Sequence, residues 1–177
     1  MDTENGFGPV SKALHWLIAA LMLGLIWLGW WMIQLSYYST WYHTAPALHK
    51  ALGLCVFGLG LVLIVWRRFS ARPAADASHR PWEKVASRVV HFALIACVIV
   101  IPVTGYIFTT SNGEAVPFFG LFELPALFAV PETLRDIAIQ LHIYASYGLL
   151  AVVLLHAGGA IKHHLIDGDR TLRRMTW

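Results

Sequence analysis

Four histidines lie inside or at the edge of long apolar segments: His15, His49, His142 and His156. An ionisable side chain is costly in hydrocarbon, so it is rarely found there without a partner. A neutral imidazole is also a good axial ligand for haem iron. The residue type and its surroundings therefore point to haem ligation, provided that the segments carrying the histidines can bring them together in pairs.

The composition is typical of a membrane protein. The chain has 177 residues, of which 58% are apolar and 13% charged, whereas a soluble domain carries about 25% charged residues. A membrane span needs about 20 mostly apolar residues. Four stretches meet this need, at roughly 11–35, 47–66, 85–110 and 134–162. We expect one integral-membrane domain over residues 1–177 with an all-α, four-helix bundle fold.

The distribution of basic residues predicts the orientation. Eleven of the thirteen Lys and Arg residues lie near the N-terminus, in the connection at 67–88, or at the end of the fourth span and in the C-terminal tail. The two opposite connections carry only Lys50 and Arg135. The positive-inside rule then places both termini and the middle connection in the cytoplasm. Because topology explains the positive charge, we expect no nucleic-acid partner. The basic residues near the middle connection are Arg67, Arg68, Arg72, Arg80, Lys84 and Arg88.

The connection at 111–131 is expected to lie at the outer surface. It contains three prolines and several phenylalanines, and this proline spacing argues against a further span. We expect a loop or a short helix that caps a buried site.

With this orientation, each histidine can be given a depth. His15 lies near the inner end of the first span, and His49 near the outer end of the second. His142 lies in the outer part of the fourth span, and His156 follows it by fourteen residues. Fourteen residues rise about 21 Å and end within about 40° of whole turns. We therefore predict that His15 pairs with His156 at the inner level, and His49 with His142 at the outer level.

Two facing imidazoles at one height suit a bis-histidine haem in a bundle. The absence of a C-x-x-C-H motif disfavours a c-type haem, and the expected cofactors are two b haems. A bare metal site or an ion path is disfavoured because the apolar parts of the spans hold no Asp or Glu. Small residues follow each histidine by three or four positions, and they permit either a close porphyrin or close helix packing. They are Ala19, Gly53, Ala145 and Gly159.

The other histidines have different expected roles. His91 lies near the inner end of the third span, where it could bind a quinone carbonyl and relay a proton, or could simply be packed. His43 lies in an outer connection and could replace His49 as a ligand. His79, in the middle connection, is expected to be solvated. At the end of the fourth span, the helix C-terminus is a sufficient partner for His163 and His164.

Several short motifs, in this order, resemble those of the bacterial cytochrome b561 family. They are His15–Trp16, the His-Lys-Ala-Leu-Gly stretch at 49–53, the Pro-Val-Thr-Gly stretch at 102–105, and the fourteen-residue spacing of His142 and His156. The resemblance covers nearly the whole chain. It implies a multi-pass protein of the bacterial inner membrane with two b-type haems, and ubiquinone or another quinone as electron partner.

The resemblance also implies roles for single residues. His15 and His156 would bind the iron of the inner haem, and His49 and His142 that of the outer haem. Some family members are superoxide:quinone oxidoreductases, and His91 matches a histidine linked to their quinone site. A serine two residues before the first ligand is associated with that site, but here the position is Ala13, and Ser11 lies two residues further back.

The expected function is that of a dihaem cytochrome with oxidoreductase chemistry. It is expected to transfer electrons between the quinone pool and superoxide or a periplasmic redox protein. The outer connections are net negative, which does not favour capture of the superoxide anion. Their acidic residues are Glu114, Glu123, Glu132 and Asp136. Two alternatives stay open. One is a haem-bearing anchor subunit of a larger dehydrogenase or hydrogenase, and the other is a haem-free small transporter or adaptor.

Overall fold

The computed structural model describes residues 2–3, 6–71, 73–74 and 78–176, so Arg72 of the predicted basic cluster lies outside the described residues. Four helices account for most of the chain: α1 (Pro9–Met32), α2 (Thr44–Phe69), α3 (Pro81–Thr109) and α4 (Glu132–Leu165). All four are long and apolar enough to cross a membrane. The prediction of an all-α, four-helix membrane bundle is confirmed, and each predicted span coincides with a helix to within about one turn.

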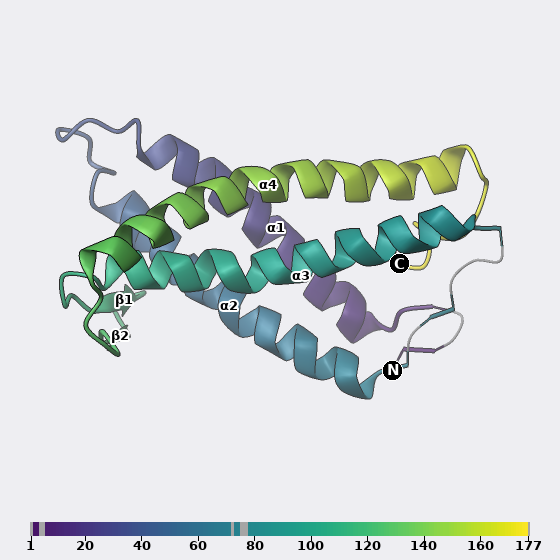
Figure 1. Ribbon diagram of the computed structural model, residues 1–177, viewed down its shortest axis with the longest axis horizontal. Coiled ribbons are helices and arrows are strands. Elements are labelled where there is room, and N and C mark those ends of the chain that lie inside the picture. Colours follow the sequence, from purple (N-terminus) through teal and green to yellow (C-terminus); the bar gives the residue numbers. More distant parts are fainter. Residues whose placement is uncertain (1, 4–5, 72, 75–77, 177) are drawn as a thin grey trace.

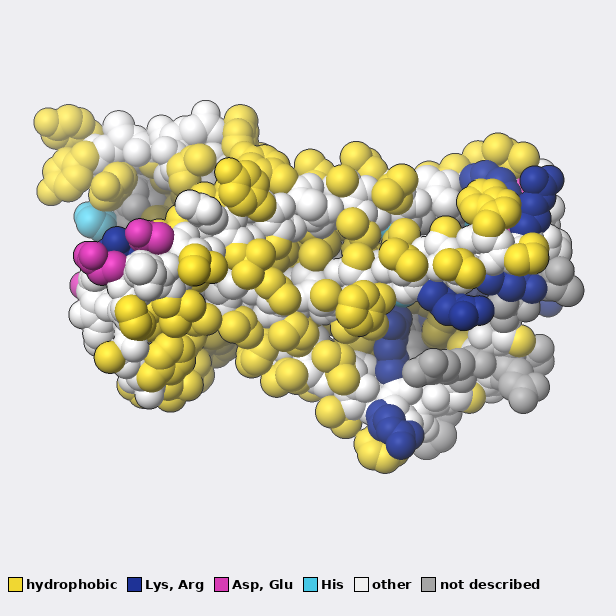
Figure 2. Space-filling model, in the orientation of Figure 1, with side chains coloured by type: hydrophobic (Ala, Val, Ile, Leu, Met, Phe, Trp, Pro, Cys, Tyr) yellow, Lys and Arg dark blue, Asp and Glu magenta, His cyan; other side chains and the backbone are white. Residues whose placement is uncertain are grey.

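The bundle has two distinct ends (Figure 1). Both termini and the connection between α2 and α3 lie at one end, which we call the terminal end. The α1–α2 connection and a small β-hairpin lie at the other, which we call the hairpin end. On the face drawn in Figure 2, Lys and Arg side chains gather at the terminal end and acidic side chains at the hairpin end.

Local sequence features start helices α1 and α3 and connect α3 to α4 at the terminal end. Pro9 and Pro81 occupy the first turns of α1 and α3, where proline has a suitable φ and its missing N–H is not needed. The Glu83 carboxylate accepts the backbone N–H of Arg80 at 2.8 Å and the Lys162 ammonium at 2.6 Å. Glu83 therefore caps α3 and also joins it to the end of α4.

Helices that are consecutive in the chain pack against each other. The main helix packing is of α1 on α2, α2 on α3, and α3 on α4. Ile18, Val56, Val98 and Leu149, one from each helix, belong to one buried cluster. Many large apolar side chains face outward instead (Figure 2). This is the arrangement expected when the solvent around the bundle is lipid.

The connection between α3 and α4 forms a β-hairpin. Strands β1 (Val116–Phe118) and β2 (Phe122–Leu124) pair antiparallel. Phe119 and Gly120 form the turn with φ values of 50° and 73°, and the second of these is a conformation that glycine adopts readily. Val116 is buried, and β1 packs against α2. The segment is a loop, as predicted, but the paired strands were not foreseen and no short helix forms here.

Candidate functional site

The first histidine pair lies toward the terminal end and joins α1 to α4. The ring centroids of His15 and His156 are 6.0 Å apart and the ring planes make an angle of 56°. Both side chains are half-buried. The structure thus brings together the two residues that the sequence placed at the inner level.

The second pair lies toward the hairpin end and joins α2 to α4. The ring centroids of His49 and His142 are 6.2 Å apart, with an interplanar angle of 64°. Nδ1 of His142 lies 2.8 Å from the backbone oxygen of Ile101. A carbonyl oxygen only accepts, so this nitrogen carries the proton and the neutral ring keeps its lone pair on Nε2. That lone pair is the one a metal would bind.

The separation of the rings is a test of whether a haem iron fits. An imidazole nitrogen lies about 2 Å from a bound metal, and the ring centre lies about 1 Å beyond it, so two imidazoles on opposite sides of one iron have centroids about 6 Å apart. The observed separations are 6.0 and 6.2 Å. Both ring separations are therefore compatible with a bis-histidine iron.

Two glycines lie directly beside the rings of the second pair. A Cβ added at Gly29 of α1 would lie 3.1 Å from Cε1 of His49, and one at Gly105 of α3 would lie 3.1 Å from Cε1 of His142. Each ring therefore lies directly against the backbone of a neighbouring helix. The sequence reasoning missed this role. The available signal was a glycine on another span at the depth of each outer histidine.

The small residues that were predicted near the ligands divide into two kinds. A Cβ added at Gly53 or Gly159 would meet nothing within 4 Å, so there is open space one turn from His49 and His156. Ala145, in contrast, packs against the buried cluster. Space for an added Cβ and close helix packing are thus both present, at different positions.

His91 lies beside the first pair. Its ring centroid is 5.1 Å from that of His156, at an interplanar angle of 83°. Its Nδ1 is 2.6 Å from the Ser87 carbonyl oxygen, so Nε2 keeps the lone pair. The guanidinium of Arg67 is close enough to interact electrostatically with His15, His91 and His156. The terminal-end site therefore contains three histidines and a cation.

The serine discussed for the quinone site is engaged elsewhere. The Ser11 hydroxyl donates to the Asp2 carboxylate at 2.6 Å and accepts the indole N–H of Trp66 at 2.8 Å. Both partners and the low exposure of Ser11 make it part of the packing of the N-terminal segment against α2.

Two further predictions concern histidines outside the pairs. His43 is exposed and its ring contacts that of Tyr42, while His49 is the residue that faces His142. The prediction that His79 is solvated is wrong, because Nε2 of His79 lies 2.7 Å from the Asp169 carboxylate and only 15% of the side chain is exposed.

Comparisons with known proteins identify the family of the chain. Residues 6–177 match the model of a family described as prokaryotic cytochrome b561. Cytochrome b561 homolog 2 of Escherichia coli (strain K12) is 38% identical over 175 residues, which cover 98% of this chain and 93% of the relative. Cytochrome b561 homolog 1 of the same organism is 24% identical over 177 residues, covering 97% of each. The chain therefore belongs to the prokaryotic cytochrome b561 family of membrane b-type cytochromes that act in electron transfer.

Proposed function

We propose that this protein is a dihaem cytochrome that carries electrons between a membrane quinone at the terminal end and a redox partner at the hairpin end. The observation that carries the proposal is the presence of two histidine pairs whose ring separations, 6.0 and 6.2 Å, both suit one iron. The basic residues at the terminal end (Figure 2) support a cytoplasmic location for that end in the bacterial inner membrane.

Each histidine pair would hold one haem. His15 and His156 would bind one haem and His49 and His142 the other, and each bound haem supplies one-electron redox chemistry. His142 is held by the Ile101 carbonyl, which fixes its tautomer and its orientation. The two pairs are separated by the fourteen positions from His142 to His156, about 21 Å along α4.

At the terminal end the protein would also handle protons. Because the Nδ1 proton of His91 is committed to the Ser87 carbonyl, its Nε2 can accept a proton from a quinol hydroxyl. Arg67 places a fixed positive charge near the same rings. A positive charge favours the reduced state of a redox group bound close to it, because that state carries more negative charge. We therefore assign His91 to the quinone site as the proton acceptor.

At the hairpin end the charge favours a basic partner over superoxide. Arg135 is one of only two basic residues in the outer connections, and it is paired with Asp136 at 3.0 Å. The remaining acidic residues make this end net negative, and acidic side chains are visible there in Figure 2. An anion is repelled by such a surface, whereas a redox protein with a basic docking surface is attracted to it.

The first test is to purify the protein and measure haem per chain by pyridine haemochrome, together with the reduced-minus-oxidised spectrum. We expect two b haems per chain with low-spin bands. A value near zero in haem-supplied cells would overturn the proposal in favour of a haem-free transporter or adaptor. Copurification of another subunit that is required for activity would favour the anchor of a larger enzyme.

The second test concerns the partners. A short-chain quinol should reduce the bound haems, and reoxidation should be faster with a basic cytochrome than with an acidic redox protein. The preference should weaken as salt is raised, because exposed charges are screened at high ionic strength. Rapid reduction by superoxide with no dependence on salt would contradict the partner that we propose.

A further inference from the structure

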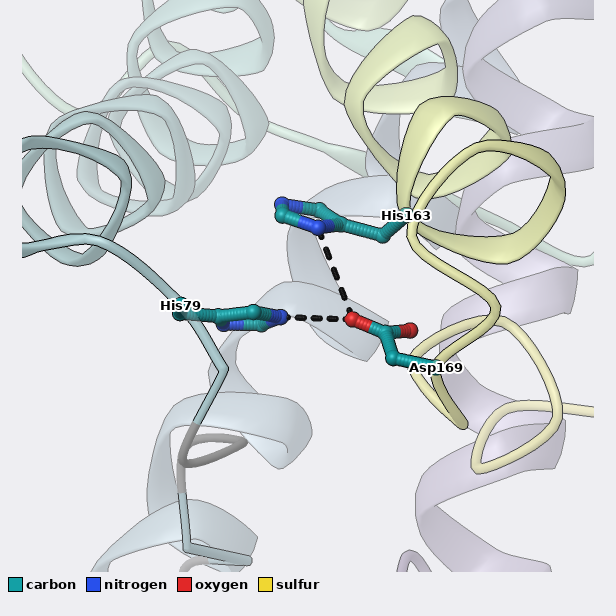
Figure 3. A group of neighbouring side chains, drawn as sticks. All are labelled: His79, His163 and Asp169. Atoms are coloured by element: carbon teal, nitrogen blue, oxygen red, sulfur yellow. Dashed lines mark hydrogen bonds and ion pairs between the residues drawn. The ribbon is translucent and has the colours of Figure 1, made fainter.

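A group of side chains at the terminal end lies outside both histidine pairs (Figure 3). His79 comes from the connection between α2 and α3, His163 from the last turn of α4, and Asp169 from the chain that follows α4. The three side chains converge although 84 residues separate the two histidines. Their exposed fractions are only 15%, 14% and 4%.

Their polar atoms have the spacing of metal ligands. Oδ2 of Asp169 lies 2.7 Å from Nε2 of His79 and 3.4 Å from Nδ1 of His163. One ligand atom from each residue lies within 4.8 Å of the others. Tetrahedral zinc binds nitrogen and oxygen at about 2.0–2.2 Å, which places its ligand atoms about 3.3 Å apart. Only small side-chain movements would be needed to enclose an ion.

The donor set selects the class of metal. Two imidazoles and one carboxylate bind zinc in open sites and iron(II) in facial triads, whereas magnesium and calcium prefer oxygen ligands. The rings of His79 and His163 are adjacent and tilted, with centroids 4.2 Å apart and an interplanar angle of 32°. An imidazole binds a metal in the plane of its ring, so one ring would have to turn before both nitrogens point at a single ion next to the Asp169 oxygen.

A supporting hydrogen bond orients the carboxylate. The backbone N–H of Thr171 donates to Oδ1 of Asp169 at 2.7 Å, which leaves Oδ2 directed toward the histidines. Burial raises the pKa of Asp169, but the Thr171 N–H and the His79 ring outweigh this and hold the pKa below its ordinary value. The carboxylate is therefore ionised and oriented, as metal ligands that have partners of their own usually are.

One neighbour would have to move. Asp167 lies 2.6 Å from the same Nδ1 of His163 and 2.7 Å from the Lys162 ammonium. A ring nitrogen cannot donate a proton to Asp167 and bind a metal at the same time. On binding, His163 would release Asp167, which keeps Lys162 as its partner, and His79 Nε2 and His163 Nδ1 would give up their protons to solvent.

We propose that His79, His163 and Asp169 form a binding site for a divalent transition-metal ion, with Zn²⁺ as the ion that the ligands fit best. The site is separate from the haem pairs and goes beyond the proposed electron transfer. A bound ion would link the α2–α3 connection to the chain after α4, and would stabilise the folded protein by an amount that rises with the logarithm of the free ion concentration above the dissociation constant.

Zinc and iron can be counted in the same sample. The haem-loaded protein, purified without a polyhistidine tag and treated with a chelator, is dialysed against a series of free Zn²⁺ concentrations, and both metals per chain are measured by atomic emission. We expect one zinc per chain in the wild type. In the His79→Ala, His163→Ala and Asp169→Asn variants we expect the affinity to fall by more than about tenfold.

The controls separate this site from the haem proposal. His164→Ala removes the adjacent histidine of α4, which is outside the cluster, and should bind zinc as the wild type does. Iron per chain should be the same in all variants, and zinc should raise the melting temperature of the wild type but not of Asp169→Asn. Equal zinc binding by the wild type and the His79→Ala/His163→Ala double variant would overturn the proposal, whatever the iron count.

Discussion

The two histidine pairs are held in different ways. At the hairpin end, Gly29 and Gly105 place helix backbone against the rings, and the Ile101 carbonyl fixes the His142 proton. At the terminal end, the pair is accompanied by His91 and by the charge of Arg67. The first site is confined by backbone, and the second contains additional groups that can titrate or carry charge.

This difference suggests a division of labour. Rings that lie against backbone have little freedom, which suits a relay that passes electrons without other chemistry. A quinol must lose protons together with its electrons, so its site needs a base close to the electron acceptor. His91, with a lone pair on Nε2, provides such a base only at the terminal end. The following substitutions test whether the two sites behave as separately as their surroundings suggest.

The largest effect is expected from removing one ligand of either pair. His142→Ala and His156→Ala should each reduce the haem content from two to one per chain, because the two residues lie about four turns apart on α4 and serve different pairs. The pyridine haemochrome value and the reduced-minus-oxidised spectrum measure this loss. His43→Ala, an exposed histidine outside both pairs, should keep two haems. Loss of both haems from one substitution would show that the sites are not independent.

The second effect concerns quinol oxidation. His91→Gln should keep both haems but slow their reduction by quinol by about a hundredfold, the scale of a lost general base. Reduction by dithionite should be unchanged, since it needs no proton acceptor. Stopped-flow spectroscopy measures both rates, and His164→Ala serves as the matched histidine control. An unchanged rate with quinol would place the quinone elsewhere.

The sequence predicted the parts of this site that depend on helix geometry alone. The rise and twist of a helix put His142 and His156 on one face at two depths, and the direction of each span then selected His15 and His49 as partners. These inferences needed no knowledge of side-chain packing. The four membrane helices were predictable for the same reason, because length and apolar content decide them.

The missing parts depend on how distant segments meet. The contacts of Gly29 and Gly105 depend on the rotation of α1 and α3 about their axes, which uniformly apolar spans do not reveal. His79 and Asp169 lie 90 residues apart, and only the tertiary structure brings them together. The hairpin has three residues in each strand, too few for an alternating pattern to be recognised.

A smaller effect is expected from filling the space beside one ring. In Gly29→Ala, the new Cβ would lie 3.1 Å from Cε1 of His49, so the ring must shift by a few tenths of an ångström. We expect one of the two midpoint potentials to change in a redox titration while the other stays the same, since axial ligands tune the potential. Gly24→Ala, on the same helix but with nothing within 4 Å of its Cβ, should change neither. A shift of both potentials would mean that the two sites are coupled through α1.

The smallest functional effect is expected at the contact between α2 and α3, away from both pairs. A Cβ at Gly60 would lie 2.5 Å from Cγ1 of Val98, and Val98 is buried and β-branched, so it cannot easily turn away. Gly60→Ala should therefore cost about 1–3 kcal/mol of stability, whereas Gly58→Ala, with open space around its Cβ, should be neutral or stabilising by up to about 1 kcal/mol through helix propensity. Thermal unfolding in detergent, followed by haem absorbance, measures both. If Gly60→Ala instead lost one haem while keeping its melting temperature, this contact would be part of a haem site, and the two pairs would not be the separate units that their different surroundings indicate.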